Sequence, residues 1–336
     1  MLERVFIASI VLTMVSIIIN ADDKRITIPK DTLPKRLNIE HVPLGLDVRK
    51  IPKDNRLTEE RVRLGRKLFF DPILSANRSI ACVTCHDPNR GFAGPATGAI
   101  GILGSRTIRK APSIFNRAYG ITFFWDGRES TLEGQALRPI SDPSEMGANL
   151  DEIVKRLKTD PEYKNLFEKS FKDGVNSTNL GKALASFERV LLRGDSPVDR
   201  FRVQGVRSAL TDTERHGLWL YESKGLCWQC HSGFNFTDEK FHNTGVSWGK
   251  SNGDLGRFVV TKSETDRGKF KTPTLRGVNL TAPYMHDGSL ATLEEVIEFY
   301  NQGGGAKGNP QLDKTLKPLS LSKDEINALV AFLKAL

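Results

Sequence analysis

The chain has 336 residues, of which 39% are hydrophobic and 26% charged, and its 49 Lys and Arg residues against 40 Asp and Glu give a formal net charge of +9. This composition excludes intrinsic disorder and is typical of a globular protein of about two domains. One apolar run alone is long enough to consider as a membrane segment, and no basic stripe with interleaved aromatic residues indicates nucleic-acid binding. The basic excess favours a partner with an acidic surface, although a solvated surface is the simpler explanation.

The N-terminus has the pattern of an export signal. A short charged start precedes the apolar run Val5 to Ile19, and the small residue Ala21 follows. A run of this length is short of the ~20 residues that span a bilayer comfortably. We therefore expect residues 1–21 to be a signal peptide or an uncleaved N-terminal anchor, because Ile19 fits the cleavage pattern imperfectly. The folded part is expected in the periplasm or another extracytoplasmic compartment.

The first predicted helix opens at Leu57-Thr58, where Thr58 and the Glu residues after it form a capping pattern. Gly65 and Leu68 lie one helical turn apart within it. Further on, residues 91–104 are rich in glycine but follow no strand, so they are not a dinucleotide-binding fingerprint. We expect a flexible linker there. Helices are expected at residues 150–157, 161–171 and 180–192, with Pro161 in a first turn.

The second half repeats this arrangement. Thr211 opens a helix in which Gly217 and Leu220 keep the same spacing as in the first half. The run Gly303 to Gly305 lacks the Gly-Lys-Ser/Thr ending of a phosphate loop and is expected to be a second flexible linker. The last helix is capped by Ser322 and carries one apolar face, formed by Ile326, Leu329, Val330 and Leu333.

The four cysteines occur in two copies of one motif, Cys82-Val83-Thr84-Cys85-His86 and Cys227-Trp228-Gln229-Cys230-His231. Two residues between the cysteines and a His directly after them is the signature of c-type haem attachment. One helical turn sets both thiols near the two haem vinyl groups, and the next residue directs its imidazole at the iron. The pattern predicts two covalently bound haem c groups, with His86 and His231 as iron ligands.

Three other uses of paired cysteines fit less well. A four-cysteine zinc site usually has its two pairs ~15–20 residues apart, whereas 141 residues separate Cys85 from Cys227. Zinc also gives no reason for a His after each pair. Disulfides across two residues are strained and mostly catalytic, and a thioredoxin-like motif would not be expected twice. The sequence therefore favours a mainly α fold of two cytochrome-c-like helical domains, residues 22–200 and 201–336, each with one haem.

Further motifs occur in order along the chain, and with the two cysteine motifs they resemble the bacterial di-haem cytochrome c peroxidase and MauG superfamily from about residue 55 to the C-terminus. These motifs are Ala111-Pro-Ser-Ile-Phe-Asn116, Phe124-Trp125-Asp126-Gly127-Arg128, Phe241-His-Asn-Thr-Gly245, Pro273-Thr-Leu-Arg276 and Pro283-Tyr-Met-His-Asp-Gly288. The resemblance implies a peroxidase that reduces hydrogen peroxide at the haem of the first motif, haem 1.

The resemblance also implies the roles of residues around haem 1. Ordinary family members carry a His after the first motif that blocks the iron until the enzyme is reduced, and here no His occurs between His86 and His216. Haem 1 is thus expected to be open without reductive activation. Trp125 matches the tryptophan between the haems, and Gln135, Pro139 and Glu145 match the distal pocket. A carboxylate there can move the proton that peroxide cleavage requires, and an amide can orient the peroxide.

Haem 2, carried by the second motif, decides the branch of the family. Ordinary members place a Met ligand 14 residues after the His of the HDG motif, and from His286 that offset reaches Tyr300. A Tyr there resembles the MauG-like branch, in which oxidising equivalents are shared over both haems and used to oxidise a protein substrate. Phenolate favours higher oxidation states than thioether does. Met285, His286 and His242 remain rival ligands.

Two departures from the family pattern bear on partners. MauG carries a surface tryptophan two residues before the second motif, where this chain has Gly225, so Trp219, Trp228 and Trp248 are the candidate relays to a substrate. The family's inter-domain calcium is implied by Thr281 and Pro283, which match the two carbonyl donors. Its Asn ligand, however, is replaced by Lys110, whose ammonium cannot bind calcium and could take the place of the ion electrostatically.

Three functions remain open from the sequence. The first is a MauG-like peroxidase that oxidises a protein or another bulky donor. The second is a cytochrome c peroxidase that removes hydrogen peroxide with electrons from small soluble cytochromes or cupredoxins. The third is a di-haem electron carrier without enzymatic activity, which the missing blocking His and the pair Gln135 and Glu145 disfavour. No nucleic acid partner is expected, and membrane contact is limited to the N-terminal segment at most.

Overall fold

The computed structural model describes residues 28–95, 98, 100–104, 106–250, 253–305 and 308–336. The expected signal peptide or anchor lies outside these residues. The described chain is mainly helical, as predicted, and its one sheet pairs two short antiparallel strands, β1 (Phe241–His242) and β2 (Phe270–Lys271). Within the described ranges, no helix is long and apolar enough to cross a membrane.

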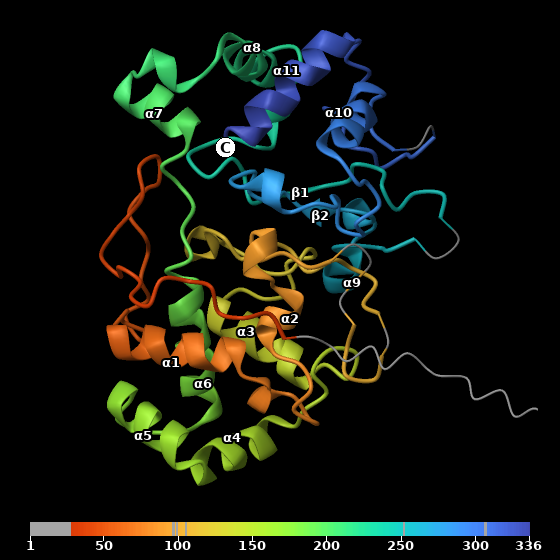
Figure 1. The fold of residues 1–336 in the computed structure, drawn as a ribbon. Helices are drawn as coiled ribbons and strands as arrows, with labels where there is room; N and C mark the ends of the chain where they lie inside the picture. Colours follow the sequence, from red (N-terminus) through yellow and green to blue (C-terminus); the bar gives the residue numbers. More distant parts are fainter. Residues whose placement is uncertain (1–27, 96–97, 99, 105, 251–252, 306–307) are drawn as a thin grey trace, which may run out of the picture.

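The α-helices divide into two groups along the chain (Figure 1). The N-terminal group comprises α1 (Glu59–Phe70), α2 (Cys82–Cys85), α3 (Leu132–Ser141), α4 (Leu150–Thr159), α5 (Pro161–Ser170) and α6 (Ser177–Glu188). The C-terminal group comprises α7 (Pro197–Gln204), α8 (Asp212–Glu222), α9 (Phe258–Thr261), α10 (Leu293–Asn301) and α11 (Lys323–Lys334). Short 3-10 turns lie at Pro72–Leu74, Pro88–Arg90, Arg117–Tyr119, Arg207–Ala209, Cys227–Gln229, Glu264–Asp266 and Val278–Leu280.

Each group surrounds its own hydrophobic core. The first core runs from Leu64 to Leu191 in the sequence and the second from Val198 to Leu336. The predicted boundary at residue 200 falls inside α7, whose Val198 is fully buried in the second core. The packing therefore divides the chain into an N-terminal half and a C-terminal half a few residues earlier, just before α7.

The same helix crossing forms the frame of both halves. In the N-terminal half α1 packs on α6, and in the C-terminal half α8 packs on α11. A Cβ atom at Gly65 would lie 1.9 Å from the carbonyl oxygen of Ala183, and one at Gly217 would lie 2.0 Å from that of Ala328. Only glycine allows backbones to approach this closely. The glycine–leucine spacing that occurs in both halves of the sequence thus corresponds to the same helix–helix contact in each half.

Helix capping follows the sequence with one shift. Thr58 and Thr211 cap α1 and α8, and Ser322 forms a capping box with Glu325 at the start of α11. Helix α6, expected at residues 180–192, instead covers Ser177–Glu188, because the side chain of Asn176 accepts from the backbone N–H of Asn179 and starts the helix one turn earlier.

The run Gly303 to Gly305 was wrongly expected to be a flexible linker. The N–H groups of Gly303 and Gly304 donate to the carbonyls of Tyr300 and Phe299, and that of Gly305 donates to Thr244. A Cβ atom at Gly245 would lie 1.5 Å from the carbonyl oxygen of Gly305. These glycines therefore permit two backbones to cross closely at the end of α10, and they fix the chain next to Tyr300.

Candidate functional site

The two cysteine motifs fold into turns with the same hydrogen bonds. The backbone N–H of His86 donates to Cys82 (3.0 Å), and that of His231 donates to Cys227 (2.9 Å). The first turn is α-helical and the second is 3-10. Each turn thus brings its two thiols and its imidazole to one side of a short helix, as thioether attachment and axial ligation require.

Both imidazoles are prepared for an iron. The Nδ1–H of His86 donates to the carbonyl oxygen of Phe92 (2.9 Å), and that of His231 donates to Phe236 (3.2 Å). A metal-binding His is usually oriented in this way by a hydrogen bond on its other nitrogen. Burial lowers the pKa of both rings, that of His231 to about 4, so the neutral form that binds metals is favoured.

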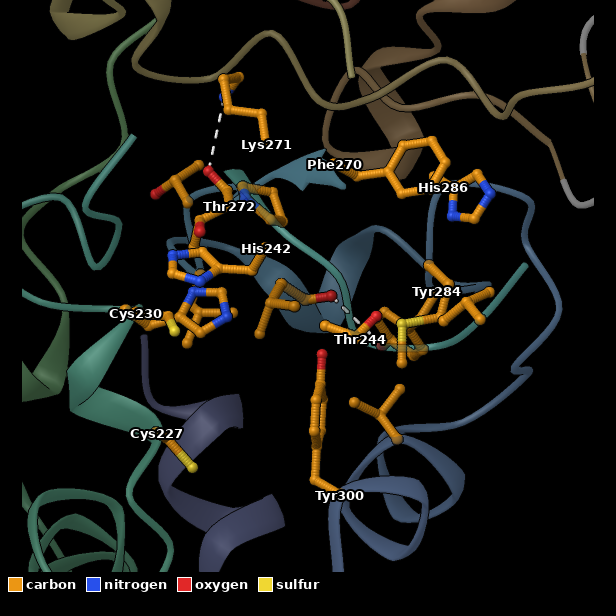
Figure 2. A pocket seen from close by; sticks show the side chains of 18 of the residues that line it. Cys227, Cys230, His242, Thr244, Phe270, Lys271, Thr272, Tyr284, His286 and Tyr300 are labelled. Atoms are coloured by element: carbon orange, nitrogen blue, oxygen red, sulfur yellow. Dashed lines mark hydrogen bonds between the residues drawn. The ribbon is translucent and has the colours of Figure 1, made fainter. Parts of the chain in front are cut away.

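A cavity between the halves adjoins the second motif (Figure 2). Its wall is largely apolar and contains Leu226, Val246, Pro273, Leu275, Val278 and Val296, and its cationic members include Arg117 and Lys271. A haem c group presents an apolar ring and two carboxylates, so this lining suits it. His231 would ligate its iron, and Cys227 and Cys230 would hold its vinyl carbons.

Tyr300 stands on α10 and points its hydroxyl group into this cavity, on the side facing the second motif (Figure 2). Burial and the neighbouring thiols of Cys230 and Cys227 raise the pKa of its phenol. The neutral form of the phenol is therefore favoured. An Fe(III) centre would have to displace that proton for Tyr300 to bind it.

The rival histidines already have partners. His242 is held between two carboxylates, with Nε2 3.0 Å from Asp238 and Nδ1 2.5 Å from Asp313. His286 is buried, stacks on Phe270 with ring centroids 3.6 Å apart, and has its Nε2 3.0 Å from the hydroxyl of Ser247. Met285 also lines the cavity, and its thioether remains the alternative to Tyr300.

The residues expected around haem 1 come from α3 and the loop after it. Gln135 and Pro139 stand four residues apart on α3 and therefore share a helix face. Glu145 follows the helix, and its backbone carbonyl accepts from Ile102 (2.8 Å). Burial, followed by the charge of Asp142, raises the pKa of Glu145. Its carboxylate in turn contributes, after burial, to the raised pKa of the Cys85 thiol in the first motif.

Trp125 connects the two halves. Its indole N–H donates to the carbonyl oxygen of Lys110 (2.8 Å), and its own carbonyl accepts from the backbone N–H of Lys271 in β2 (2.7 Å). The ring lines the cavity that contains His231 and Tyr300. The residue predicted to lie between the haems is thus fixed by contacts to both halves.

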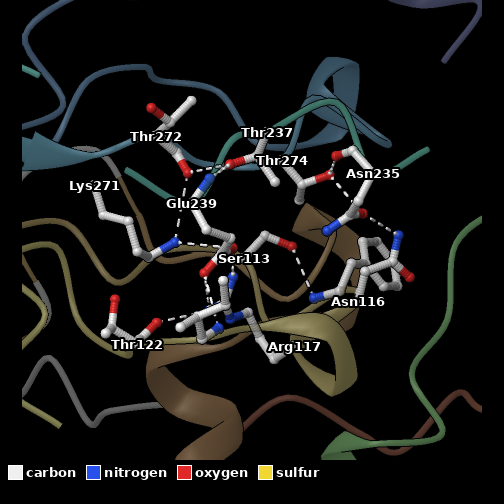
Figure 3. A network of polar contacts seen from close by, with 12 residues as sticks. Ser113, Asn116, Arg117, Thr122, Asn235, Thr237, Glu239, Lys271, Thr272 and Thr274 are labelled. Carbon is white, nitrogen blue, oxygen red and sulfur yellow. Dashed lines mark hydrogen bonds and ion pairs between the residues drawn. The ribbon is translucent and has the colours of Figure 1, made fainter. Parts of the chain in front are cut away.

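A buried ion network beside the cavity escaped sequence analysis (Figure 3). Glu239 accepts from both terminal nitrogens of Arg117 (2.9 and 3.3 Å) and lies 3.4 Å from the Nζ of Lys271. Burial opposes the ionised carboxylate, but Arg117 and Lys271 outweigh it and lower the pKa of Glu239 to about 2. Glu239 lies 122 positions from Arg117 and 32 positions from Lys271 in the sequence, so no local pattern could have identified the network.

The comparisons with known proteins agree with this architecture. The model of the di-haem cytochrome c peroxidase family matches residues 59–208. The methylamine utilization protein MauG of Methylorubrum extorquens is 41% identical over 85% of this chain and 80% of its own. The chain belongs to the di-haem cytochrome c peroxidase family. Cytochrome c551 peroxidase of Nitrosomonas europaea is 36% identical over 82% of this chain and 80% of its own.

A solved structure extends the agreement to three dimensions. The crystal structure of a MauG-like protein associated with microbial copper homeostasis has a TM-score of 0.81 and 33% identity, and the match covers 88% of this chain and 94% of that one. The predicted family and fold are confirmed, and the chain is a di-haem peroxidase, an oxidoreductase with two haem c groups. A pure electron carrier is therefore disfavoured.

The position that the di-haem peroxidase family implies for calcium is taken by a side chain. The Nζ of Lys110 donates to the carbonyl oxygens of Thr281 and Pro283, the latter at 2.7 Å. Calcium binds oxygen ligands at 2.3–2.6 Å, so an ion held by both carbonyls would overlap the ammonium. These residues do not fit calcium. Elsewhere in the described part of the chain, no cluster of three or more His, Cys, Asp or Glu side chains suits a metal ion.

Proposed function

We propose that this di-haem peroxidase is exported, reduces hydrogen peroxide at haem 1, and shares the oxidising equivalents through Trp125 with a haem 2 held by His231 and Tyr300. The equivalents are then used to oxidise a protein or another bulky donor. The observation that carries the proposal is Tyr300, which enters the cavity next to the second motif while both rival histidines are engaged.

At haem 1 the protein supplies a group that transfers a proton and a group that orients the peroxide. Cleaving peroxide heterolytically requires a proton to move from one peroxide oxygen to the other, and the Glu145 carboxylate can accept it and return it. Burial raises its pKa and so brings the group closer to neutral pH, where such transfer is most efficient. The amide of Gln135 orients the peroxide, and Pro139 shapes the wall. The bound haem iron supplies the electrons.

At haem 2 the iron ligand determines how the oxidising equivalents are used. A phenolate is an anionic donor and stabilises Fe(III) over Fe(II), which lowers the reduction potential, whereas a thioether raises it. A low potential makes haem 2 a poor acceptor for electrons from small cytochromes and a good site for storing oxidising equivalents. This property fits the oxidation of a protein donor better than routine peroxide removal.

The decisive experiment measures the haem 2 potential and its spectrum in the wild type and in Tyr300→Met. We expect the wild type to lack the thioether-to-iron band at the red edge of the ferric spectrum, and the variant to show a higher haem 2 potential. Met285→Leu is the matched control and should leave both unchanged. A wild type that shows the thioether band and loses it in Met285→Leu contradicts the proposal.

That outcome would support the second candidate function. Met285 lines the same cavity, and a Met-ligated haem 2 of high potential would accept electrons from small soluble cytochromes or cupredoxins. The protein would then be a cytochrome c peroxidase that detoxifies hydrogen peroxide. Both functions use the same haem 1 chemistry, so the potential of haem 2 discriminates between them.

The exit route to a bulky donor is best served by Trp228. Trp219, Trp228 and Trp248 are 57%, 48% and 40% exposed. Of these, Trp228 stands inside the second cysteine motif and lines a surface pocket together with His231 and Phe236. Its ring therefore reaches both the solvent and the immediate surroundings of haem 2, which a relay between haem and donor requires.

Trp228→Phe should slow the oxidation of a protein donor without changing the rate of peroxide cleavage at haem 1, because the substitution removes the easily oxidised indole and keeps an aromatic ring. Single-turnover kinetics with the donor in excess separate the two steps. Trp219→Phe and Trp248→Phe serve as controls. Equal donor oxidation in Trp228→Phe and the wild type would move the exit route to another residue.

A further inference from the structure

Lys110 occupies an unusual position for a lysine. It is 5% exposed, and it belongs to the N-terminal half while its ammonium donates to Thr281 and Pro283 of the C-terminal half. Within the described part of the chain, the ammonium donates to these two backbone carbonyls and pairs with no carboxylate. Ammonium groups are seldom buried without an anionic partner, and a cage of carbonyl oxygens is what a hard metal cation prefers.

The backbone of Lys110 makes two further contacts that link the halves. Its N–H donates to the carbonyl of His286 (2.8 Å), and its carbonyl accepts from the indole N–H of Trp125 (2.8 Å). One residue therefore holds the segment 281–286 with two kinds of bonds and also fixes the tryptophan at the junction. Loss of the ammonium would therefore remove two of the bonds that hold this segment beside the residue that fixes the indole.

The adjacent residue strengthens the same junction. Arg109 donates from Nε and one terminal nitrogen to Asp254 of the C-terminal half (2.6 and 2.9 Å), and another terminal nitrogen pairs with Asp126. Arg109 thus satisfies its charge with carboxylates, as buried arginines generally do. Lys110 differs because its ammonium contacts carbonyl oxygens and no carboxylate. Arg109 therefore forms salt bridges, whereas Lys110 occupies a position that resembles a cation-binding site.

We propose that Lys110 is a built-in cation that replaces a metal ion between the halves and positions Trp125 against the cavity of haem 2. The protein should consequently need no calcium for stability or for communication between its haems. This inference stands apart from the proposed donor and from the ligand of haem 2, because it concerns the junction alone.

The first test uses the wild-type holoprotein. Treatment with a calcium chelator should leave its melting temperature and the reduction potentials of both haems unchanged, and added calcium should have no effect. A wild type that loses stability with the chelator and recovers it with calcium overturns the proposal.

The second test compares two substitutions at the same position. Lys110→Met removes the charge and should lower the melting temperature and both haem potentials, because loss of a nearby positive charge favours Fe(III). Lys110→Asn supplies an amide oxygen instead, so calcium should restore its melting temperature and raise its potentials above those of Lys110→Met. If Lys110 only filled space, the haem potentials of the wild type, Lys110→Met and calcium-loaded Lys110→Asn would not follow the charge at this position.

The control is Lys271→Met, which removes another buried lysine of the same junction whose ammonium pairs with Glu239. Calcium should rescue Lys110→Asn and have no effect on Lys271→Met, and potassium should rescue neither. The proposal fails if Lys110→Met matches the wild type in stability and potentials, or if calcium does not distinguish Lys110→Asn from Lys271→Met.

Discussion

The N-terminal and C-terminal halves share a frame and differ in what they present to their haems. In each half a glycine on one helix lets its backbone contact the backbone of a second helix. The first of these helices is followed by a turn that carries two thiols and an imidazole. The polar residues to which we assign the chemistry come from elsewhere. Gln135 stands on α3 and Glu145 follows that helix in the first half, and Tyr300 stands on α10 in the second.

The two halves divide between them two tasks, peroxide cleavage and the storage of oxidising equivalents, that a single haem domain would have to combine. The first half offers an acid–base group and an amide, which suit the cleavage of a small oxidant. The second half offers a phenol and a surface indole, which suit the storage and export of oxidising equivalents. Duplication of the frame allows each site to be optimised for one task, with Trp125 between them.

The largest expected effect tests whether each half carries its own haem. Cys82→Ala and Cys227→Ala should each remove one of the two covalent haems, because the thioether attachment needs the thiol. Quantification of covalent haem in the purified variants checks this. Only Cys82→Ala should also abolish peroxide cleavage. A purified variant that retains two covalent haems would refute the assignment of that motif.

The next effect concerns the acid–base group of the first half. Glu145→Gln should slow peroxide cleavage by roughly 10²–10⁴-fold, the usual contribution of a positioned proton-transfer group, with haem content intact. Rapid mixing with hydrogen peroxide measures the rate. Asp142→Asn, which removes a neighbouring carboxylate, is the matched control and should have a smaller effect. An unchanged rate in Glu145→Gln would assign the proton transfer to another residue.

The smallest effect tests the shared frame itself. Gly65→Ala and Gly217→Ala should each destabilise the protein by at least roughly 1–3 kcal/mol, because a methyl group at either position meets a backbone carbonyl and the helices must separate. Denaturant unfolding of the holoprotein measures both. Gly134→Ala is the control, since its methyl group would meet the movable end of the Glu129 side chain. If one glycine tolerates alanine, the two crossings are not equivalent.

Most of the helices could be predicted from local patterns in the sequence. The caps at Thr58, Thr211 and Ser322 and the two glycine spacings depend on residues one turn apart, so they can be identified from the sequence alone. The extent of α6 was less predictable, because it depends on an asparagine cap that competes with ordinary turn formation. The run at Gly303 was misinterpreted, since its packing partner Gly245 is remote in the sequence.

The candidate site was predictable to the extent that spacing defines it. The haem motifs and the offset from His286 to Tyr300 are properties of the sequence. The engagement of His242 by two carboxylates and the partners of Lys110 require the folded chain, because Asp313 and Thr281 lie 71 and 171 residues from these side chains. The structure thus adds contacts that weigh against two of the rival ligands, His242 and His286, which the sequence leaves open.

The guanidinium of Arg276 bears on the biogenesis of the protein. It is 1% exposed and binds Asp199 through two nitrogens (2.7 and 2.9 Å), and it also donates to the carbonyls of Gly45 and Phe234. Gly45 lies 231 residues earlier in the chain. The leading segment therefore cannot reach its final place until the chain as far as Arg276 is available to it. Because such long-range contacts form late in folding, we expect both cysteine motifs to be accessible for haem attachment before the two halves close on each other.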